Sequence, residues 1–249
     1  MNLFIISDLH LKVTDEPLYG SLLTILKERC NDGDIIVLAG DLFDVFIGTK
    51  HIFTDCFKEF IEAVRIATAR GAKVHYIEGN HDFFMRNAFR DLKGFVAHAR
   101  SFTVEIEGKR FFVAHGDTVD KSAYFYRGLR LLLRSSLMRM ISAVTPGAFI
   151  RAIGEAASRR GRAKRPVVSD DLPPAVRENM RRMFRNFAVE KISSGYDFVA
   201  LGHCHDPDEM IFKIGDRSGQ YINVGYPRVH GTFLLWRVGD EKIRREPLP

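Results

Sequence analysis

Five short polar motifs, each placed directly after an apolar run of strand length, constrain this 249-residue chain more than any other feature. The preceding runs, such as FIIS and IIVLA, have the composition of buried strands. Because ligand sites in α/β proteins form at the carboxyl ends of strands, all five motifs are expected to converge at one edge. In chain order they are Asp8-Leu9-His10, Gly40-Asp41-Leu42-Phe43-Asp44, Gly79-Asn80-His81-Asp82, His115-Gly116-Asp117 and Gly202-His203-Cys204-His205.

Taken singly, most of these motifs have an ordinary structural explanation. A lone histidine in a strand is usually a hydrogen-bonded core residue, and Gly-Asn and Gly-Asp are common turn signals. Their occurrence together, each after a strand, argues against coincidence. The motifs supply carboxylate and amide oxygens and imidazole nitrogens, a mixture that suits two borderline or hard divalent ions. A shared carboxylate can bridge two such ions and form a clamp for phosphoryl displacement.

The rest of the pattern predicts an α/β protein with a helical insertion. Apolar runs predict strands at 2–7, 34–39 and 73–78, a hairpin at 101–107 and 110–115, and strands at 197–201, 210–214, 220–224, 231–238 and 242–246. Helical spacing occurs at 18–30, 53–70, 121–143, 148–157 and 173–192, with a flexible basic linker at 161–166. We expect a core formed by residues 1–118 and 194–249, interrupted by a helical lid at 119–193.

The predicted insertion carries most of the basic character of the chain. Residues 121–165 hold eleven of the 37 basic residues and one of the 31 acidic residues. An apolar face there has four arginines around its edge, a pattern that favours anionic lipid surfaces or acyl chains. The alternative is a helix packed on the body with solvated arginines. The apolar residues are Leu129, Leu132, Leu133, Leu137, Met140 and Ile141, and the arginines are Arg127, Arg130, Arg134 and Arg139.

The compartment is indicated by the cysteines and by the first residues. The chain has three cysteines and no Cys-x-x-Cys pair, which argues against a disulfide framework or a thiolate zinc site and fits a reducing compartment. The N-terminal sequence MNLFIISDLHL has no basic segment and a short apolar run, unlike a signal peptide. No apolar run is long enough to span a bilayer. We therefore expect a cytoplasmic protein.

The five motifs resemble those of the calcineurin-like metallophosphoesterase superfamily, whose pattern is D-x-H, G-D-x-x-D, G-N-H-[DE], H and G-H-x-H. The resemblance implies an α/β fold, a four-layer α/β/β/α sandwich, holding two divalent ions. Manganese is favoured, with iron or zinc as alternatives. By the family pattern one ion would be held by Asp8, His10, Asp41 and His205, and the other by the bridging Asp41 with Asn80, His115 and His203.

The remaining motif residues have expected supporting roles. His81, beside the ligand Asn80 in the catalytic motif, would donate a hydrogen bond to phosphate or protonate the leaving oxygen rather than bind metal. Asp44 and Asp82 would orient an imidazole or a metal-bound water. For Asp82 an equal alternative is the N-cap of a following helix. Cys204, between two expected ligands, is interpreted as a small buried residue.

A narrower resemblance covers most of the chain. The segments DLHL, GDLFDVFIG, GN-x-DFF, AHGDT and G-H-x-H-x-P are similar to those of the bacterial UDP-2,3-diacylglucosamine diphosphatase family of lipid A synthesis. That resemblance implies hydrolysis of a lipid-linked nucleotide to UMP and 2,3-diacylglucosamine 1-phosphate. It also implies a helical lid over the acyl chains and peripheral attachment to the anionic inner face of the bacterial inner membrane. Nucleic acid is not an expected partner, and the oligomeric state stays open.

Several substrate-contact positions depart from that family. His81 stands where the best-known members have arginine, and Ala123 stands where they have an acidic residue, with Asp120 and Lys121 nearby. In place of Ser-x-x-x-Asn-x-x-Lys the chain has Ser158 followed by Arg162 and Arg165. Asp120, Arg162 and Arg165 are therefore the candidate substrate contacts.

These departures leave other functions open. One alternative is a phosphoesterase acting on another phosphodiester, nucleotide pyrophosphate or phosphomonoester, with the basic segment steering anions. A second is a nuclease or nucleic-acid-binding protein whose basic segment contacts backbone phosphates. A non-catalytic scaffold is disfavoured because no ligand position of the pattern is missing.

Overall fold

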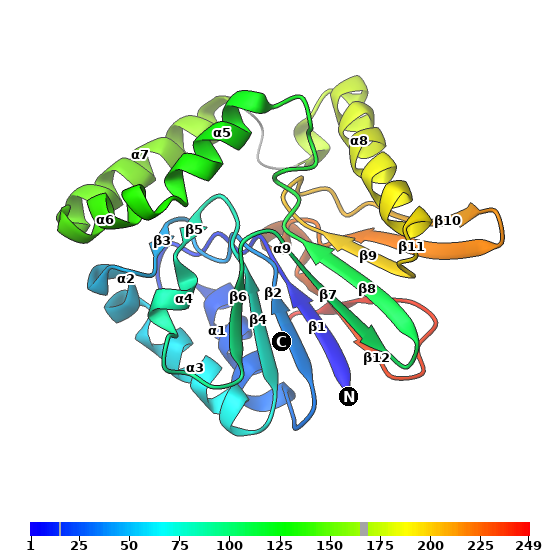
Figure 1. Ribbon diagram of the computed structural model, residues 1–249, viewed down its shortest axis with the longest axis horizontal. Helices are drawn as coiled ribbons and strands as arrows, with labels where there is room; N and C mark the ends of the chain where they lie inside the picture. The colour runs from blue at the N-terminus through cyan, green and yellow to red at the C-terminus, as the bar shows by residue number, and fades with distance from the viewer. Residues whose placement is uncertain (15, 165–168) are drawn as a thin grey trace.

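Two β-sheets face each other and helices cover the outer face of each, so the layers run α/β/β/α (Figure 1). The computed structural model describes residues 1–14, 16–164 and 169–249, and for residues 161–164 it describes the backbone alone. This arrangement confirms the predicted four-layer fold. Within the described residues, none of the helices is both long and apolar enough to cross a bilayer.

The first sheet carries the N-terminal motifs. Its strands β1, β2, β4 and β6 run parallel, and β12 and β13 continue it in antiparallel pairing. Apolar side chains on its outer face pack against α1, a π-helical turn over Ile25–Arg29, and α3. In sheet order the strands are β13 (Arg244–Pro247), β12 (Thr232–Arg237), β1 (Asn2–Ile6), β2 (Ile35–Leu38), β4 (Lys73–Ile77) and β6 (Phe95–His98), and the helices are α1 (Pro17–Thr24) and α3 (Lys58–Ala69).

The second sheet carries the C-terminal motifs. Strands β8, β9 and β11 run parallel, and β7 and β10 pair antiparallel at its edges. Helix α8 (Pro174–Ser193) packs on its outer face through Phe184, Ala188 and Ile192. In sheet order the strands are β10 (Glu209–Ile214), β11 (Arg217–Asn223), β9 (Phe198–Leu201), β8 (Lys109–Ala114) and β7 (Ser101–Ile106).

The core between the sheets explains why the strands read as continuous apolar runs. Parallel strands covered on both sides bury both of their faces, so polar residues do not alternate along them. Val37, Phe111 and Trp236 meet between the sheets and are almost fully buried. Burying each such side chain contributes roughly 1.5–3 kcal/mol to stability.

Three helices between β8 and α8 lie above the carboxyl ends of β1, β2 and β4 (Figure 1), and we call them the cover helices. Lys50 anchors them by donating hydrogen bonds to the carbonyl oxygens of Ala143 (2.9 Å) and Thr145 (2.7 Å). Gly154 packs so closely that an added Cβ would lie 2.7 Å from a methyl of Val45. The cover helices are α5 (Tyr124–Leu133), α6 (Ser136–Val144) and α7 (Gly147–Lys164).

The predicted insertion at 119–193 contains two kinds of packing. The cover helices lie over the motif loops, whereas α8 lies on the second sheet as the outer helical layer of the body. Helix α8 is amphipathic, and its apolar side is buried against β9, β10 and β11 of the second sheet. Helix α8 thus packs on the body, whereas the cover helices pack on the motif loops.

Two predicted helices are each divided in the structure. The helix expected at 53–70 is α2 (His51–Cys56) followed by α3, because Phe57 leaves helical geometry and packs its ring 4.4 Å from that of Phe43. The helix expected at 121–143 is α5 and α6, because the Ser135 side chain caps α6 by accepting a hydrogen bond from Met138 N (3.2 Å).

Other differences concern short elements and the predicted linker. Helix α7 continues to Lys164, so the flexible linker predicted at 161–166 is wrong for its first four residues, and the remainder lies outside the described residues. The sequence pattern did not indicate several short elements beside the motif loops and near the edge of the first sheet. They are β3 (Phe46–Ile47), β5 (Asp82–Phe83), α4 (Met85–Ala88), β6, the 3-10 turn Ser169–Asp171 and α9 (Pro227–His230).

Candidate metal centre

The five polar motifs meet at one edge of the two sheets, as predicted. Three follow β1, β2 and β4 of the first sheet, and two follow β8 and β9 of the second. Their donor atoms include two neighbouring groups that each draw on both sheets, and within each group the atoms lie within 4.8 Å of one another. The groups are Asp8, His10 and His205, and Asp41, His115 and His203.

The first group brings both ends of the chain together. His205 Nε2 lies 3.2 Å from His10 Nε2 and 3.4 Å from Asp8 Oδ1. All three side chains are mostly buried, with exposed fractions of 14%, 10% and 0% in that order. Two neutral imidazole nitrogens this close favour a shared proton or cation, and the carboxylate adds the negative charge that a cation needs.

The second group is centred on Asp41. Its Oδ2 lies 3.3 Å from His115 Nε2 and 3.9 Å from His10 Nε2, so this carboxylate stands between the two groups. His203 Nδ1 and Asn80 Oδ1 both approach His115 Nε2, at 3.2 and 3.3 Å. These carboxylate oxygens and imidazole nitrogens are donors that suit divalent ions.

The donor side chains rest on unusual backbone conformations. Five of the seven expected ligands have positive φ, in the left-handed region that non-glycine residues seldom adopt. Such conformations cost on the order of 1–3 kcal/mol each and persist only where the surroundings enforce them. The five are Asp8 (58°), His10 (47°), Asp41 (52°), His203 (68°) and His205 (56°).

Glycines allow the motif loops to approach one another. An added Cβ on Gly79 would lie 2.1 Å from Asp41 Oδ1, and one on Gly202 would lie 2.3 Å from Asp8 Oδ2. Neither contact can be accommodated without moving a donor carboxylate. Gly79 therefore sets the spacing between two loops of the first sheet, and Gly202 sets the spacing between the loops of the two sheets.

Hydrogen bonds from the body orient the donors. His115 Nδ1 lies 3.1 Å from the carbonyl oxygen of Ala39, which directs its other ring nitrogen toward the site. The backbone N–H of His203 donates to both oxygens of Asp8, at 3.1 and 3.0 Å. Asn223 Nδ2 donates to the carbonyl oxygen of Gly202 at 2.9 Å and holds the start of the last motif.

Burial and charge set the protonation of the donors. Burial lowers the pKa of His10 to about 3 and that of His203 to about 4, so both imidazoles are neutral near pH 7 and offer a lone pair. Burial opposes the charge of His115 too, but the carboxylates of Asp41 and Asp8 outweigh it and raise the pKa to about 10. A divalent ion at this place would replace that proton.

His81 is oriented toward the site. Its Nδ1 lies 2.7 Å from the carbonyl oxygen of Asp44, an acceptor, so Nδ1 carries the proton and Nε2 is left facing the site, 3.9 Å from Asp41 Oδ2. The side chain is 21% exposed. His81 also forms a third close group with His10 and Asp44. It can therefore reach either a bound phosphate or a cation.

The two supporting aspartates act through different contacts. Asp44 Oδ1 accepts a hydrogen bond from Ser158 of α7 (2.7 Å), which links the loop after β2 to the cover helices. Asp82 accepts hydrogen bonds from the Tyr76 hydroxyl and Gly79 N, both at 2.6 Å. The suggested N-cap role of Asp82 is wrong, because Phe84 precedes α4. Burial raises the pKa of Asp82 to about 7, and the charge of Asp41 adds to that effect.

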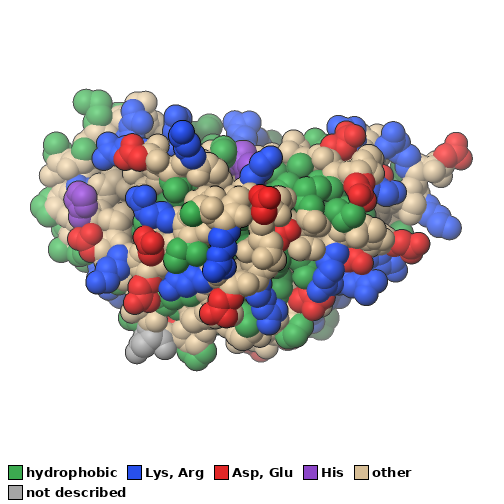
Figure 2. All heavy atoms as spheres, turned by 90° about the horizontal axis from the view of Figure 1, so that it is seen from below, with side chains coloured by type: hydrophobic (Ala, Val, Ile, Leu, Met, Phe, Trp, Pro, Cys, Tyr) green, Lys and Arg blue, Asp and Glu red, His purple; other side chains and the backbone are tan. Residues whose placement is uncertain are grey.

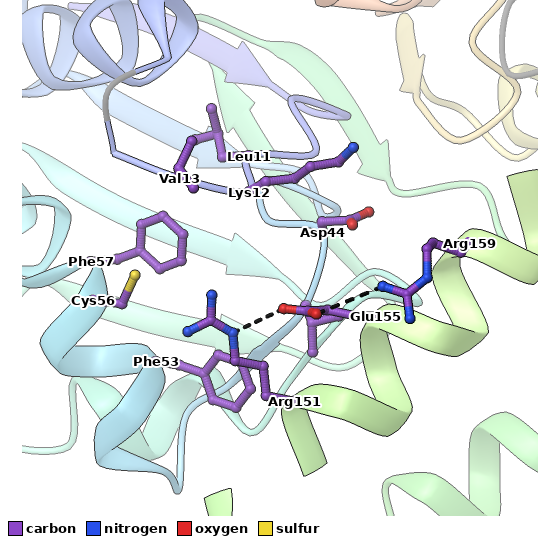
Figure 3. Close-up of a pocket in the computed structure, with 11 residues that line it drawn as sticks. Leu11, Lys12, Val13, Asp44, Phe53, Cys56, Phe57, Arg151, Glu155 and Arg159 are labelled. Atoms are coloured by element: carbon purple, nitrogen blue, oxygen red, sulfur yellow. Dashed lines mark hydrogen bonds and ion pairs between the residues drawn. The ribbon is translucent and has the colours of Figure 1, made fainter. Parts of the chain in front are cut away.

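A pocket of about 260 Å³ opens beside Asp44 (Figure 3). Apolar side chains of the body, including Leu11, Phe53 and Phe57, form one wall, and α7 forms the other. Glu155 of α7 pairs with both Arg151 (2.9 Å) and Arg159 (3.8 Å). The pocket is thus partly apolar and partly cationic, and it adjoins the candidate metal centre.

Among the candidate substrate contacts, the structure describes the side chain of Asp120 alone. Asp120 accepts hydrogen bonds from the backbone and hydroxyl of Ser122, at 2.8 and 2.6 Å, in the turn before α5. Arg162 lies in α7 among the residues whose side chains are not described, and Arg165 lies outside the described residues.

Two arginines predicted to lie at the edge of the apolar face of the cover point into the protein instead. Arg130 is 7% exposed and Arg134 Nε lies 3.4 Å from Glu78 Oε2. Arg134 also donates to the carbonyl oxygen of Glu78 at 2.9 Å, just before the Gly79-Asn80 step. They dock the cover on the motif loops, so the interpretation of both as lipid-facing cations is wrong.

Residues outside the motifs also shape the site. Arg228, in α9, donates to the carbonyl oxygens of Leu9 (2.9 Å) and His10 (2.7 Å). The ring of Tyr226 stacks on His205 with centroids 4.4 Å apart and planes at 10°. The segment Tyr226-Pro227-Arg228 carries no recognisable motif, so sequence reasoning could not have identified these residues.

The chain matches known proteins along most of its length. The family model for calcineurin-like phosphoesterases matches residues 1–207. A protein of Aeromonas salmonicida (strain A449) named UDP-2,3-diacylglucosamine hydrolase is 23% identical over 261 residues, covering 100% of this chain and 95% of the relative. A protein of Pseudomonas aeruginosa (strain UCBPP-PA14) with the same name is 24% identical over 226 residues, covering 90% of each.

Solved structures show a more distant likeness. An archaeal phosphodiesterase is 15% identical with a TM-score of 0.45, and the match covers 99% of both chains. The Zn²⁺ complex of Vps29 from Entamoeba histolytica is 12% identical with a TM-score of 0.42, covering 99% of this chain and 97% of the other.

Proposed function

The chain belongs to the calcineurin-like phosphoesterase family, and from that premise we propose that it hydrolyses the pyrophosphate bond of UDP-2,3-diacylglucosamine. The products would be UMP and 2,3-diacylglucosamine 1-phosphate. Membership of the family makes the chain a metallophosphoesterase, and its clustered His and Asp groups fit divalent metal ions. The relatives named UDP-2,3-diacylglucosamine hydrolase support the finer assignment, since each match covers nine-tenths or more of this chain.

We assign the first metal to Asp8, His10, Asp41 and His205, and the second to Asp41, Asn80, His115 and His203. Manganese is the proposed metal. Two divalent ions held there would lower the pKa of a bound water toward neutrality and offset negative charge on the phosphate oxygens. The protein's part is to fix the positions of the donors, and the left-handed ligand residues and closely packed glycines do so.

His81 is the proposed catalytic side chain. The carbonyl of Asp44 fixes its ring, so Nε2 faces the space between the donor groups. In its protonated form Nε2 can donate to a phosphate oxygen or to the leaving oxygen as the phosphorus–oxygen bond breaks. The neighbouring Asn80 is proposed to bind the second metal through its amide oxygen.

The observation that carries the substrate proposal is the apolar surface of the cover helices. A phosphoester site beneath exposed apolar helices suits a lipid-linked phosphate, because acyl chains leaving the site can contact those helices. Large hydrophobic side chains of the cover helices are exposed, with exposed fractions from 41% to 86%. They are Tyr124, Phe125, Leu129, Leu131, Leu132, Leu137, Met140, Ile141, Val144, Phe149 and Ile153.

The same surface is proposed to contact the inner face of the bacterial inner membrane. Arg127, Arg139 and Arg160 are exposed on the cover helices and can meet anionic headgroups. On the face seen from below the view of Figure 1, basic and acidic side chains are intermixed (Figure 2). The cover helices lie at the opposite side, at the top of Figure 1, and that side is the one proposed to meet lipid.

The proposed reaction is tested by incubating the Mn²⁺-loaded protein with UDP-2,3-diacylglucosamine in mixed micelles and measuring UMP. We expect UMP release that is absent in the Asp41→Ala variant. Parallel assays with a soluble phosphodiester distinguish a general phosphoesterase. Hydrolysis of the soluble ester without any UMP release from the lipid would overturn the substrate assignment.

A further inference from the structure

A row of arginines on α8 holds the loop that leaves the last histidine motif. Asp206 directly follows His205 and is fully buried. Arg177 donates to its Oδ1 at 2.8 Å, and Arg181 donates to Oδ2 at 2.5 Å and to Oδ1 at 2.9 Å. Such charge-assisted, two-pronged contacts fix the carboxylate both in distance and in orientation.

We propose that Asp206, held by Arg177 and Arg181, is a positioning residue that fixes His205 for metal binding. This inference rests on the proposed ligand role of His205. Both arginines lie in α8, which contributes no donor to the site. This helix belongs to the outer helical layer, on the far side of β9 from the first sheet (Figure 1).

The backbone at His205 explains why such a support is needed. His205 has φ of 56°, an unfavourable conformation that the surroundings must enforce. Upstream, Asn223 holds the carbonyl of Gly202. Downstream, Asp206 is followed by Pro207, which restricts the backbone of the residue before it. The buried carboxylate therefore gives the loop its fixed point on the C-terminal side of the ligand.

The 3-10 turn Ser169–Asp171, which precedes α8, shares this fixed point. Ser169 Oγ lies 3.3 Å from Asp206 Oδ1, and Asp170 pairs with Arg177 at 2.7 Å. Two segments far apart in sequence thus converge on one carboxylate. Loss of the Asp206 charge would release both the ligand loop and the start of the segment before α8.

The neighbouring pair on the same helix provides a matched control. Arg185 donates to both oxygens of Asp208, at 2.8 and 2.7 Å, and Asp208 is 5% exposed. Asp208 lies beyond Pro207, and its carbonyl oxygen accepts from Asn223 N at 2.8 Å. The two ion pairs are alike in geometry and burial, but Asp206 is the one adjacent to the ligand.

The experiment is calorimetric titration of the metal-free full-length protein with Mn²⁺, combined with thermal melting of each variant. We expect Asp206→Asn to weaken one of two binding steps by about 10- to 100-fold, the usual effect of removing a residue that orients a ligand. Asp208→Asn should lower the melting temperature and leave both binding steps unchanged. Arg181→Lys should retain more Mn²⁺ affinity than Arg181→Gln.

Two further variants make the outcome decisive. If His205→Ala leaves Mn²⁺ binding unchanged, the ligand assignment fails and the proposed metal centre with it. If His205→Ala weakens binding but Asp206→Asn and Arg181→Gln do not, the positioning role alone is overturned. Equal losses in Asp206→Asn and Asp208→Asn would also overturn it, because a general loss of stability would then explain both. Should Asp206→Asn fail to fold, Arg181→Gln, which leaves Arg177 in place, decides the question.

Discussion

Arg130 of α5 donates a hydrogen bond of 2.5 Å to the carboxylate of Asp117, two residues beyond the candidate ligand His115. Both side chains are almost completely buried, and the Tyr126 hydroxyl donates to the same carboxylate at 2.7 Å. The first cover helix is therefore anchored on a loop of the metal centre by an internal ion pair.

Replacing Arg130 by Ala should lower the free energy of unfolding by about 3–5 kcal/mol, because Asp117 would be left buried without its partner. Urea denaturation followed by circular dichroism measures the change. Arg127→Ala is the matched control, since Arg127 is exposed on the same helix and its loss should change stability by no more than about 0.5 kcal/mol. Equal effects of the two substitutions would contradict an internal anchor.

Asp41→Ala should abolish phosphoester hydrolysis and reduce the metal content of the loaded protein. The carboxylate lies between both donor groups, so its loss affects both proposed metals. Elemental analysis after Mn²⁺ loading should give two ions per chain for the wild type. One ion per chain in the fully active wild type would rule out the dinuclear arrangement.

His81→Ala should lower kcat by about 10²- to 10⁴-fold, the usual contribution of a general acid, and leave the bound Mn²⁺ unchanged. The expected difference from Asp41→Ala lies in the metal content, because His81 is assigned to the substrate. Elemental analysis and kinetics on the same preparation measure both. Loss of one ion in the variant, at unchanged melting temperature, would instead make His81 a ligand.

The free energy of unfolding should fall on acidification because of the His75–His98 pair at the edge of the first sheet. Burial lowers the pKa of His75 from 6.5 to about 4, and the neighbouring His98, at 3.0 Å, adds to the effect. Between these pH values the unfolded chain binds a proton that the folded chain does not, so the free energy of unfolding decreases as pH falls from about 6.5 to about 4. His75→Phe should reduce that slope, and an identical slope would exclude His75 as its source.

Reversing two exposed charges of the cover, in the variant Arg127→Glu with Arg139→Glu, should weaken binding to anionic liposomes by at least about tenfold at low salt. Co-sedimentation with phosphatidylglycerol vesicles measures the effect. Lys109→Glu with Lys213→Glu is the control, because both lysines are exposed on the body strands β8 and β10. If both double variants bind like the wild type, the charge of the cover has no part in membrane contact.

The strand–helix pattern was sufficient for an α/β protein and for the convergence of the motifs, and the four-layer arrangement was implied by the family resemblance. Strand-length apolar runs followed by polar residues place a donor at the end of each strand, whatever the exact loop geometry, and this explains why Asp8 and His205 could be expected to meet. The division of helix 53–70 could not be predicted, because it depends on Phe57 packing against Phe43 across the core. Local periodicity contains no information on such a contact.

The fine structure of the site depends on contacts that have no sequence signature. The left-handed backbone at His10 and His205 is not indicated by the apolar periodicity of the flanking strands. The burial of Arg130 and Arg134 depends on where α5 docks, whereas an amphipathic pattern shows only that one face of the helix is apolar. The proposed positioning role of Asp206 depends on α8, because Arg177 and Arg181 of that helix hold its carboxylate. Both arginines lie more than twenty residues before Asp206 in the chain, so no local motif indicates the contact.

The two donor groups assigned to the metals combine side chains from both sheets, and this has a consequence for the integrity of the molecule. Asp8 and His10 from the first sheet meet His205 from the second, while Asp41 meets His115 and His203. Neither sheet alone supplies all the proposed ligands, so the metal centre requires both sheets to be folded and packed together. A metal bound there would act as a reversible cross-link between the two sheets, joining residues nearly two hundred positions apart along the chain.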